Sequence, residues 1–280
     1  MMVNLGGIVP LSTIDWIGRA AIVIFLRGCP LRCPHCHNRE LQEGSSPVDI
    51  SLLQKEMEKS LAMEYSSDQI TLDEAIRRAT VKPFVSSLVL SGGEPLMQPQ
   101  QSAALLKLAK KYHLKTGLET SGYYPERLRN LLDEKLVDKI FLDLKDALLE
   151  HDYARATGRS GAAKQVLQSL RICMASGIPL DVRTTIFPEM PATSSVIDIA
   201  KMLSELEKEY PEHGLEFLIL QQGRPCQGES HFEPVSLDEL KAVAMMIEEM
   251  VAVKVRAAPK RELERAENCQ AWPQEGEIED

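Results

Sequence analysis

The sequence predicts an α/β fold built around a parallel β-sheet, and three observations lead to that expectation. Short apolar runs rich in β-branched residues alternate along the chain with segments whose apolar residues recur every three to four positions. Such alternation is typical of parallel sheets, either barrel-like or doubly wound. Neither an internal repeat nor a low-complexity linker is visible before residue 257. We therefore expect the 280 residues to form one large domain with a tail.

Six apolar runs are predicted to form the strands of this sheet. Each is short and rich in β-branched or aromatic residues, which is the pattern of a strand buried on both faces. In chain order they are Ile22–Leu26, Val85–Leu90, Lys115–Glu119, Lys139–Leu144, Leu180–Phe187 and Leu215–Leu220. Because helical segments separate them, we expect neighbouring strands to be parallel.

Five segments are predicted to be helices. Four of them carry apolar residues at helical spacing, namely Ser102–Tyr112, Ala163–Ser176, Ser194–Glu209 and Ser236–Met250. A fifth begins at Thr71, because Glu74 stands three residues later, at the spacing of a capping box. These helices are expected to cover the faces of the sheet.

The composition excludes several classes of protein. Lys+Arg 32 against Asp+Glu 41 gives a formal net charge of −9, which argues against nucleic acid as the main ligand. Six cysteines in 280 residues are too few for a disulfide scaffold. The longest purely apolar run, Ala20–Leu26, has seven residues, whereas a membrane helix needs about 20. With no leader-like segment visible at the N-terminus, we expect a cytoplasmic protein with reduced thiols.

The composition changes near the C-terminus. Residues 260–280 contain three basic and seven acidic residues and show no periodicity. Charged segments of this kind are typically solvated. The sequence therefore predicts a folded domain over residues 1–256 and a charged, flexible tail over residues 257–280.

Three of the six cysteines lie close together, directly after the first predicted strand. Cys29, Cys33 and Cys36 have the spacing C-x3-C-x2-C, and Gly28 before them permits a tight turn. Short spacings of this kind let three sulfur atoms converge from a single loop. The cysteine loop therefore predicts a metal centre.

Two kinds of metal centre are compatible with the cysteine loop. A zinc ion could take the three thiolates together with His35 or His37. Alternatively, the thiolates could bind three irons of a 4Fe-4S cluster and leave the fourth iron without a protein ligand. The spacing favours the cluster, because a zinc knuckle normally draws its next ligand from a second pair of cysteines. The next cysteine, Cys173, lies in a predicted helix instead, where a small buried apolar side chain is expected.

A second motif, Ser91-Gly92-Gly93-Glu94-Pro95, follows the second predicted strand. Paired glycines at the carboxyl end of a strand let the backbone approach a ligand closely, and Glu94 adds a hydrogen-bond acceptor. Open α/β sheets and barrels bind ligands at this end of their strands. Alone the motif would indicate an ordinary turn between strand and helix. Together with the cysteine loop it indicates a ligand site.

These motifs resemble those of radical S-adenosylmethionine (SAM) enzymes. The similarity spans roughly Gly7 to Arg256 and is closest to the activating proteins of anaerobic ribonucleoside-triphosphate reductase, and more distant to those of pyruvate formate-lyase. The matching stretches are Pro10–Trp16, Arg27–Asn38, Ser91–Pro95, Glu119–Gly122, Asp143–Lys145 and Arg183–Thr185. The cysteine motif is specific for the superfamily. The Cys-His-Asn ending at residues 36–38 and the Asp-x-Lys at 143–145 point to the activating enzymes.

The resemblance implies a fold and a reaction. The fold would be a partial parallel (β/α)6 barrel over residues 1–256, with the active site at the carboxyl ends of its strands. Cys29, Cys33 and Cys36 would ligate one 4Fe-4S cluster, and SAM would chelate the fourth iron. An electron from a low-potential, ferredoxin- or flavodoxin-like donor would cleave SAM to methionine and a 5′-deoxyadenosyl radical. That radical would take a hydrogen from a backbone glycine of a partner enzyme, here anaerobic ribonucleoside-triphosphate reductase. The resemblance assigns no catalytic role to any side chain beyond the cluster ligands.

The resemblance also implies a set of SAM-binding residues. They are His35, His37, Gly92, Gly93, Glu94, Glu119, Asp143, Lys145, Arg183 and Gln222. Asp143 and Lys145 stand two apart on a predicted strand and so share a face, and an ion pair at the strand end is the alternative to SAM binding. Arg183 could bind a carboxylate, or equally form a salt bridge inside the barrel.

Three departures from the family pattern qualify these expectations. The sequence has Glu119-Thr-Ser-Gly122 where the family generally shows Asp-Thr-Asn-Gly, so a monovalent cation site is not assumed. Gln221 or Gln222 stands in place of a strand histidine. No cysteine lies between Cys36 and Ser91, so a single cluster is expected. A radical SAM enzyme acting on another glycyl-radical enzyme or on a small molecule is the first alternative, and a zinc-binding interaction protein is the second.

Overall fold

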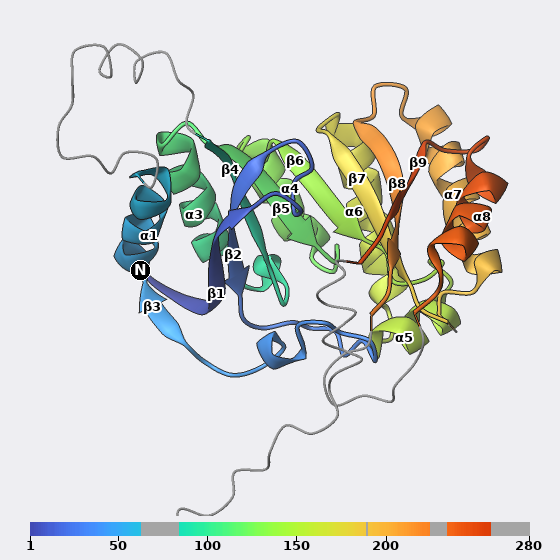
Figure 1. Cartoon of the computed structure of the whole chain (residues 1–280), viewed down its shortest axis with the longest axis horizontal. Coiled ribbons are helices and arrows are strands. Elements are labelled where there is room, and N and C mark those ends of the chain that lie inside the picture. Colours follow the sequence, from blue (N-terminus) through green and yellow to red (C-terminus); the bar gives the residue numbers. More distant parts are fainter. Residues whose placement is uncertain (63–83, 189, 225–233, 259–280) are drawn as a thin grey trace, which may run out of the picture.

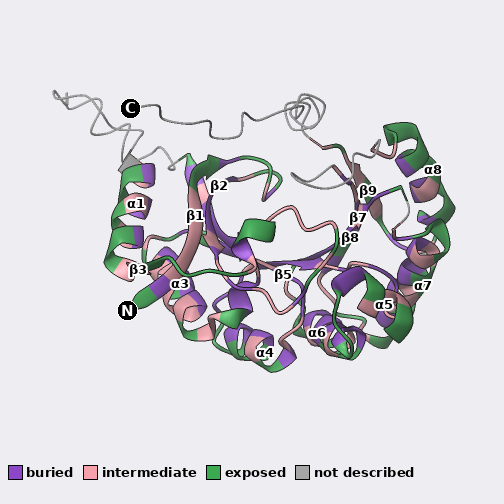
Figure 2. Cartoon of the chain, turned by 90° about the horizontal axis from the view of Figure 1, so that it is seen from below, coloured by how far each residue is buried: buried purple, intermediate pink, exposed green. Residues whose placement is uncertain are grey.

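The computed structural model describes residues 1–62, 84–188, 190–224 and 234–258. Within these residues the strands form one nine-stranded sheet in the order β3-β1-β2-β4-β5-β6-β7-β8-β9. The sheet curves into a partly open barrel whose outer face is covered by helices (Figures 1 and 2). The predicted α/β class with a mainly parallel sheet is confirmed.

Seven of the described strands run parallel to their neighbours. The strands are β1 (Met2–Ser12), β2 (Ala20–Leu26), β3 (Pro47–Asp49), β4 (Val85–Gly92), β5 (Lys115–Thr120), β6 (Lys139–Asp143), β7 (Leu180–Ile186), β8 (Leu215–Gln222) and β9 (Val253–Arg256). The parallel series begins at β2 and continues from β4 to β9, whereas β1 runs antiparallel to both β2 and β3. The six predicted strands are β2 and β4–β8. The described sheet therefore exceeds the expected six strands by β9 at one end and by β1 and β3 at the other.

The described α-helices connect the parallel strands across the outer face. They are α1 (Ile50–Ala62), α3 (Pro99–Lys111), α4 (Pro125–Asp133), α5 (Glu150–Thr157), α6 (Ala162–Ser176), α7 (Thr193–Glu209) and α8 (Leu237–Ile247). Two 3-10 turns, η1 (Arg39–Leu41) and η2 (Pro95–Met97), lie next to the candidate site. Four predicted helices correspond to α3, α6, α7 and α8. The helix predicted to begin at Thr71 lies outside the described residues.

The sheet separates two apolar cores of unequal size. The larger core lies between the sheet and the helices, and the smaller one, inside the barrel, is formed by Trp16, Ala21, Val23, Val89 and Phe141. Trp16 belongs to the loop that joins β1 to β2, and its ring meets Phe141 edge-on at 5.8 Å between ring centroids. Because this loop precedes β2, it fills the barrel at the amino ends of the parallel strands. The carboxyl ends are left for the site.

A half-buried carboxylate joins β5 to β6 outside the candidate site. Asp138 accepts hydrogen bonds from the Thr116 amide and hydroxyl, both at 2.8 Å, and from Lys110 and Lys115 at 2.9 and 3.1 Å. Burial alone would raise the pKa of Asp138, but these hydrogen bonds hold it at about 2. A carboxyl whose pKa is lowered on folding stabilises the fold above its unfolded pKa, and this contribution is lost as the pH falls towards 2.

We therefore expect Asp138→Asn to lower the free energy of unfolding by about 1–2 kcal/mol at pH 7. The difference from the unaltered chain should shrink as the pH falls from about 4 towards 2, because the carboxyl is then protonated in both states. Urea unfolding at a series of pH values measures it, with the exposed Asp133→Asn as the matched control. A loss of the same size at every pH would contradict this account of Asp138.

Some expectations concern residues that the structure does not describe. Cys226, Cys269 and nearly all of the predicted tail lie there, so the domain boundary at residue 256 stays a prediction. None of the helices in the described part of the chain combines the length and the apolar character that a membrane span requires.

Candidate active site

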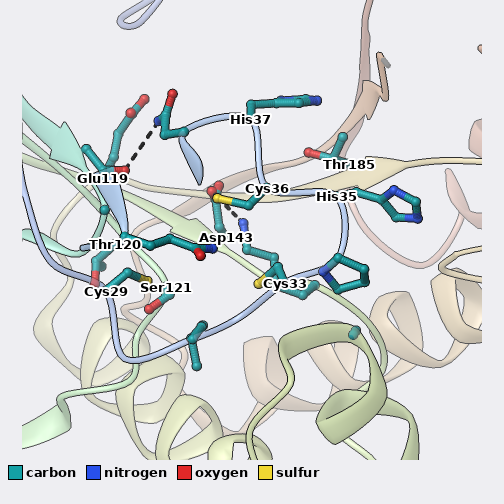
Figure 3. A pocket seen from close by; sticks show the side chains of 18 of the residues that line it. Cys29, Cys33, His35, Cys36, His37, Glu119, Thr120, Ser121, Asp143 and Thr185 are labelled. Carbon is teal, nitrogen blue, oxygen red and sulfur yellow. Dashed lines mark hydrogen bonds and ion pairs between the residues drawn. The ribbon is translucent and has the colours of Figure 1, made fainter. Parts of the chain in front are cut away.

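A cavity of about 210 Å³ lies at the carboxyl ends of the parallel strands. Its wall combines the loop after β2 with residues at the ends of β4, β5, β6, β7 and β8 (Figure 3). The predicted site residues on this wall are Cys29, Cys33, His35, Cys36, His37, Gly92, Gly93, Glu119, Asp143 and Lys145. Three predicted residues, Glu94, Arg183 and Gln222, do not line the cavity. The structure therefore brings most of the predicted site together.

The cysteine loop is held at its start by backbone hydrogen bonds. The amide of Gly28 donates to Leu41 O at 2.7 Å, and the amide of Cys29 donates to Gln42 O at 3.1 Å. The guanidinium of Arg32 bonds back to the Cys29 carbonyl at 2.7 Å. Gly28 has φ +97°, the left-handed conformation that glycine adopts without strain. The loop presents Cys29, Cys33 and Cys36 as half-buried free thiols.

The two glycines after β4 hold the backbone against the cysteine loop. A Cβ added to Gly92 would lie 2.3 Å from Leu26 O, and one added to Gly93 would lie 2.4 Å from Gly28 O. The Gly93 amide also donates to Leu26 O at 2.9 Å. The motif predicts that these glycines let the backbone approach a ligand closely. In the structure, the space that a Cβ would take is filled by the start of the cysteine loop.

Gly92→Ala is therefore expected to lower the free energy of unfolding by about 3 kcal/mol or more. The new methyl group would meet backbone atoms that cannot rotate away, and Gly92 also has φ +124°. Gly7→Ala is the matched control, because a Cβ there meets nothing within 4 Å, and we expect it to change stability by at most about 0.5 kcal/mol. Equal unfolding midpoints for the two variants in urea would contradict this explanation.

Glu94 supports the site from beneath the cavity wall. Its side chain is fully buried, and one carboxylate oxygen accepts from Leu96 N at 3.0 Å and from Thr120 Oγ1 at 2.8 Å. The other oxygen accepts from the amide and hydroxyl of Ser121 at 2.8 and 2.5 Å. Burial raises the pKa of Glu94, and these hydrogen bonds oppose that shift. Glu94 thus caps η2 and clamps the loop after β5, and SAM binding by Glu94 stays an untested prediction.

Glu119 and Arg183 form an ion pair that links the cavity floor to the barrel interior. One Glu119 oxygen pairs with the Arg183 guanidinium, and the other accepts from Ser91 Oγ at 2.5 Å. Arg183 lies against the Phe141 ring, 4.0 Å from its centroid, and donates to Asp15 O in the β1–β2 loop at 2.9 Å. Burial raises the pKa of Glu119, and Arg183 opposes that shift. Two roles are predicted for Arg183, namely binding a carboxylate and forming a salt bridge inside the barrel. In the structure Arg183 forms the internal salt bridge.

Asp143 and Lys145 project into the cavity together. The Lys145 ammonium donates to Asp143 Oδ2 at 3.0 Å, and both side chains stay about one third exposed, at 29% for Lys145 and 35% for Asp143. Burial disfavours the Lys145 charge, but Asp143 and then Cys33 outweigh it and raise the Lys145 pKa. Lys145 is therefore an ammonium at neutral pH and can bind an anionic group of a ligand.

An aromatic group forms the opposite wall of the cavity. His35 stacks on Phe187 with 4.4 Å between ring centroids, and the His37 ring lies 5.9 Å from that of Phe187. Burial, together with Arg224, lowers the pKa of His37 to about 4, so His37 is neutral at pH 7. Phe187 was not predicted as a site residue. It ends an apolar strand, where nothing in the sequence distinguishes a cavity wall from the core.

The two glutamines at the end of β8 face opposite ways. Gln221 lines the cavity and donates to Thr185 Oγ1 at 3.3 Å. Gln222 instead donates to Val235 O at 2.8 Å. Successive strand residues point to opposite faces, so only one of the pair can reach the site. The structure puts Gln221 on the cavity wall, and SAM binding by Gln222 stays a prediction.

The donor set of the cysteine loop fits a thiolate-bound cluster. Three free thiols from one loop share one cavity, and thiolates are the protein ligands of iron–sulfur clusters. Burial raises the pKa of Cys29 to about 12 and also raises that of Cys33, so both are neutral thiols until a cationic metal group displaces their protons. Among the described residues, no three His, Cys, Asp or Glu side chains form a group that could hold a single metal ion.

Comparisons with known proteins place these features in a family context. The model of the Radical SAM superfamily matches residues 23–223. A Methanocaldococcus jannaschii protein, whose name provisionally assigns it to the glycyl-radical enzyme activating enzymes, is 28% identical over 210 residues, 74% of this chain and 78% of that protein. The pyruvate formate-lyase 2-activating enzyme of Escherichia coli strain K12 is 27% identical over 186 residues, 59% of this chain and 61% of that enzyme. The solved structure of a radical SAM methyltransferase from Sphaerobacter thermophilus aligns with 87% of this chain and 67% of its own, with a TM-score of 0.64 and 12% identity. At this identity the similarity shows the fold alone.

Proposed function

The chain belongs to the radical SAM superfamily, and we propose that it is a glycyl-radical enzyme activating enzyme. The observation that carries the proposal is the cavity in which three free thiols face the Asp143–Lys145 ion pair at the carboxyl ends of the strands. Relatives of this chain are named as activating enzymes of glycyl-radical enzymes, which supports the same reading. A zinc-binding interaction protein is no longer needed to explain the cysteine loop.

The residues of the cavity divide between the two cofactors. Cys29, Cys33 and Cys36 would hold a single 4Fe-4S cluster, because thiolates suit iron and the three share one loop. SAM would lie against the remaining wall. When bound, the two cofactors supply the electron transfer and hydrogen abstraction on which radical SAM chemistry rests.

The protein's own groups orient SAM and exclude water. Lys145 can pair with the SAM carboxylate, and Asp143 can accept from its amino group or from a ribose hydroxyl. The stacked rings of His35 and Phe187 offer an apolar surface for the adenine. Glu94, Arg183 and Gln222 remain proposed SAM contacts, although in the structure their side chains are engaged with the protein.

The partner proposed for this chain is anaerobic ribonucleoside-triphosphate reductase, with a low-potential ferredoxin- or flavodoxin-like protein as electron donor. The resemblance over roughly Gly7 to Arg256, which is closest to the reductase-activating proteins, supports this choice, and the Cys-His-Asn ending at residues 36–38 and the Asp-x-Lys at residues 143–145 support an activating enzyme. The absence of further cysteines between Cys36 and Ser91 supports a single cluster rather than an added ferredoxin-like module.

Electron paramagnetic resonance tests the proposed partner. The reconstituted chain is incubated anaerobically with SAM, a reductant and either the reductase or pyruvate formate-lyase, and the spectrum of each partner is recorded. We expect a glycyl radical on the reductase only. A radical on pyruvate formate-lyase alone would identify that enzyme, and not the reductase, as the partner. SAM cleavage with no radical on either protein would favour a small-molecule substrate.

A further inference from the structure

Three arginines and two tyrosines form a connected surface beside the cysteine loop. We define Arg32, Tyr123, Tyr124, Arg127 and Arg159 as the arginine–tyrosine patch. Arg159 Nε donates to the Tyr123 hydroxyl at 3.1 Å, the Tyr123 and Tyr124 rings meet edge-on at 5.1 Å, and the Arg127 guanidinium lies 4.2 Å from the Tyr124 ring centroid. Arg32 and Arg159 are exposed, whereas Arg127 and the two tyrosines are half-buried. The patch therefore offers both cationic and aromatic groups to solvent.

The patch is attached to the cysteine loop at one end and to the turn η2 at the other. At one end the Arg32 guanidinium bonds to the Cys29 carbonyl, and the Arg32 amide bonds to Thr157 O at 2.7 Å, two residues before Arg159. At the other end Arg127 donates to Leu96 O at 2.8 Å. Burial raises the pKa of Tyr124, and the Arg127 guanidinium opposes that shift. The patch thus borders the Cys29 side of the proposed cluster.

The charge of the patch is opposite to that of the whole protein. The chain has a formal net charge of −9, but among the ion pairs of the described residues the only one within the patch joins Arg32 to Glu43 at 2.7 Å. Arg127 and Arg159 bond to a carbonyl and a phenol, which leaves their charges uncompensated. An acidic protein is therefore attracted to this surface by the charges of Arg127 and Arg159.

We propose that the arginine–tyrosine patch is the docking surface of an acidic one-electron donor protein. This inference rests on the proposed function, since it requires a cluster on Cys29, Cys33 and Cys36. The donor loses one electron, the bound cluster gains it, and no bond forms or breaks. In Figure 3, Cys29 and His35 lie on opposite sides of the cavity, so a donor at the Cys29 side leaves the His35–Phe187 side for the glycine-bearing partner. The two partners can then bind without competing.

The test compares a protein reductant with a small one. Arg127→Gln/Arg159→Gln removes two patch charges. Arg129→Gln/Arg155→Gln is the control and removes two exposed charges outside the patch, one from α4 and one from α5. Each double variant is assayed for SAM cleavage with reduced flavodoxin and with dithionite, which needs no docking surface. Flavodoxin binding to the reconstituted chain is measured separately by titration at low and moderate salt.

We expect the patch variant to bind flavodoxin about tenfold more weakly, with a smaller salt dependence, and to lose a similar factor in the flavodoxin-supported rate. Its rate with dithionite should stay within about twofold of the unaltered chain, and the control variant should match the unaltered chain throughout. Equal flavodoxin binding by both variants, or an equal loss with both reductants, would overturn the docking surface. Failure of the unaltered chain to cleave SAM with dithionite would instead contradict the proposed function, and the binding titration would still decide on the patch.

Discussion

Cys33→Ala should abolish both cluster binding and SAM cleavage. Cys33 supplies one of three thiols in the cavity, and a 4Fe-4S cluster that loses one of three protein ligands is not retained. We expect iron to fall well below about four per chain after anaerobic reconstitution. SAM cleavage should fall more than about 100-fold, beyond the 10–100-fold that is typical of residues which only support a metal ligand. Iron analysis and chromatography of 5′-deoxyadenosine measure the two effects.

Cys173→Ala is the matched control for this prediction. Cys173 is a free cysteine whose pKa is raised, as that of Cys33 is, but it is fully buried in α6 within the larger core. Its replacement should leave iron content and SAM cleavage unchanged. Cys33→Ser, which keeps the side-chain volume, separates loss of the ligand from loss of packing. Retained SAM cleavage in Cys33→Ala would refute the ligand assignment.

Glu94→Ala should be the most destabilising change beside the cavity, at about 3–5 kcal/mol. The substitution leaves Leu96 N, the Thr120 hydroxyl and both Ser121 donors without their acceptor, and all of these are buried. It also frees the loop after β5, so SAM cleavage should fall together with stability. Urea unfolding of the anaerobically purified protein measures the loss.

Two further variants keep the Glu94 prediction decidable if the alanine variant does not fold. Ser121→Ala removes only one donor and should cost about 1 kcal/mol. Glu126→Ala, on the exposed face of α4, should cost at most about 0.5 kcal/mol. If Ser121→Ala proved as harmless as Glu126→Ala, the clamp around Glu94 would contribute little to stability.

The strands of the barrel could be predicted because burial on both faces leaves a continuous apolar run. β2 and β4–β8 all show that run. β1 contains two glycines, a proline and polar residues, and β3 and β9 have only three and four residues, so none of them stands out from the surrounding loops. Helices α4 and α5 are also short, at nine and eight residues, so each has few turns over which an apolar period can repeat.

The cysteine loop could be predicted because its spacing alone determines that the three cysteines share a loop. β6 ends at Asp143, so Lys145 reaches the cavity from the segment after the strand and not from the strand face that the spacing predicted. The role of Glu94 could not be predicted, because the motif indicates a hydrogen-bond acceptor but not which residues donate to it. In the structure they come from Thr120 and Ser121, on another strand. Arg183 likewise depends on Glu119 and on the β1–β2 loop, which are far from it in sequence.

We propose that this chain takes a hydrogen atom from a partner's backbone glycine, and that the hydrogen passes to the 5′-deoxyadenosyl radical that one-electron cleavage of SAM would supply. The direct measurement uses anaerobic ribonucleoside-triphosphate reductase whose glycines carry deuterium at Cα, incubated with the reconstituted chain, SAM and reductant. Mass spectrometry of the 5′-deoxyadenosine then reports where its hydrogen came from. We predict that deuterium enters 5′-deoxyadenosine in step with the glycyl radical. Formation of 5′-deoxyadenosine without deuterium in the presence of the labelled partner would contradict the claim.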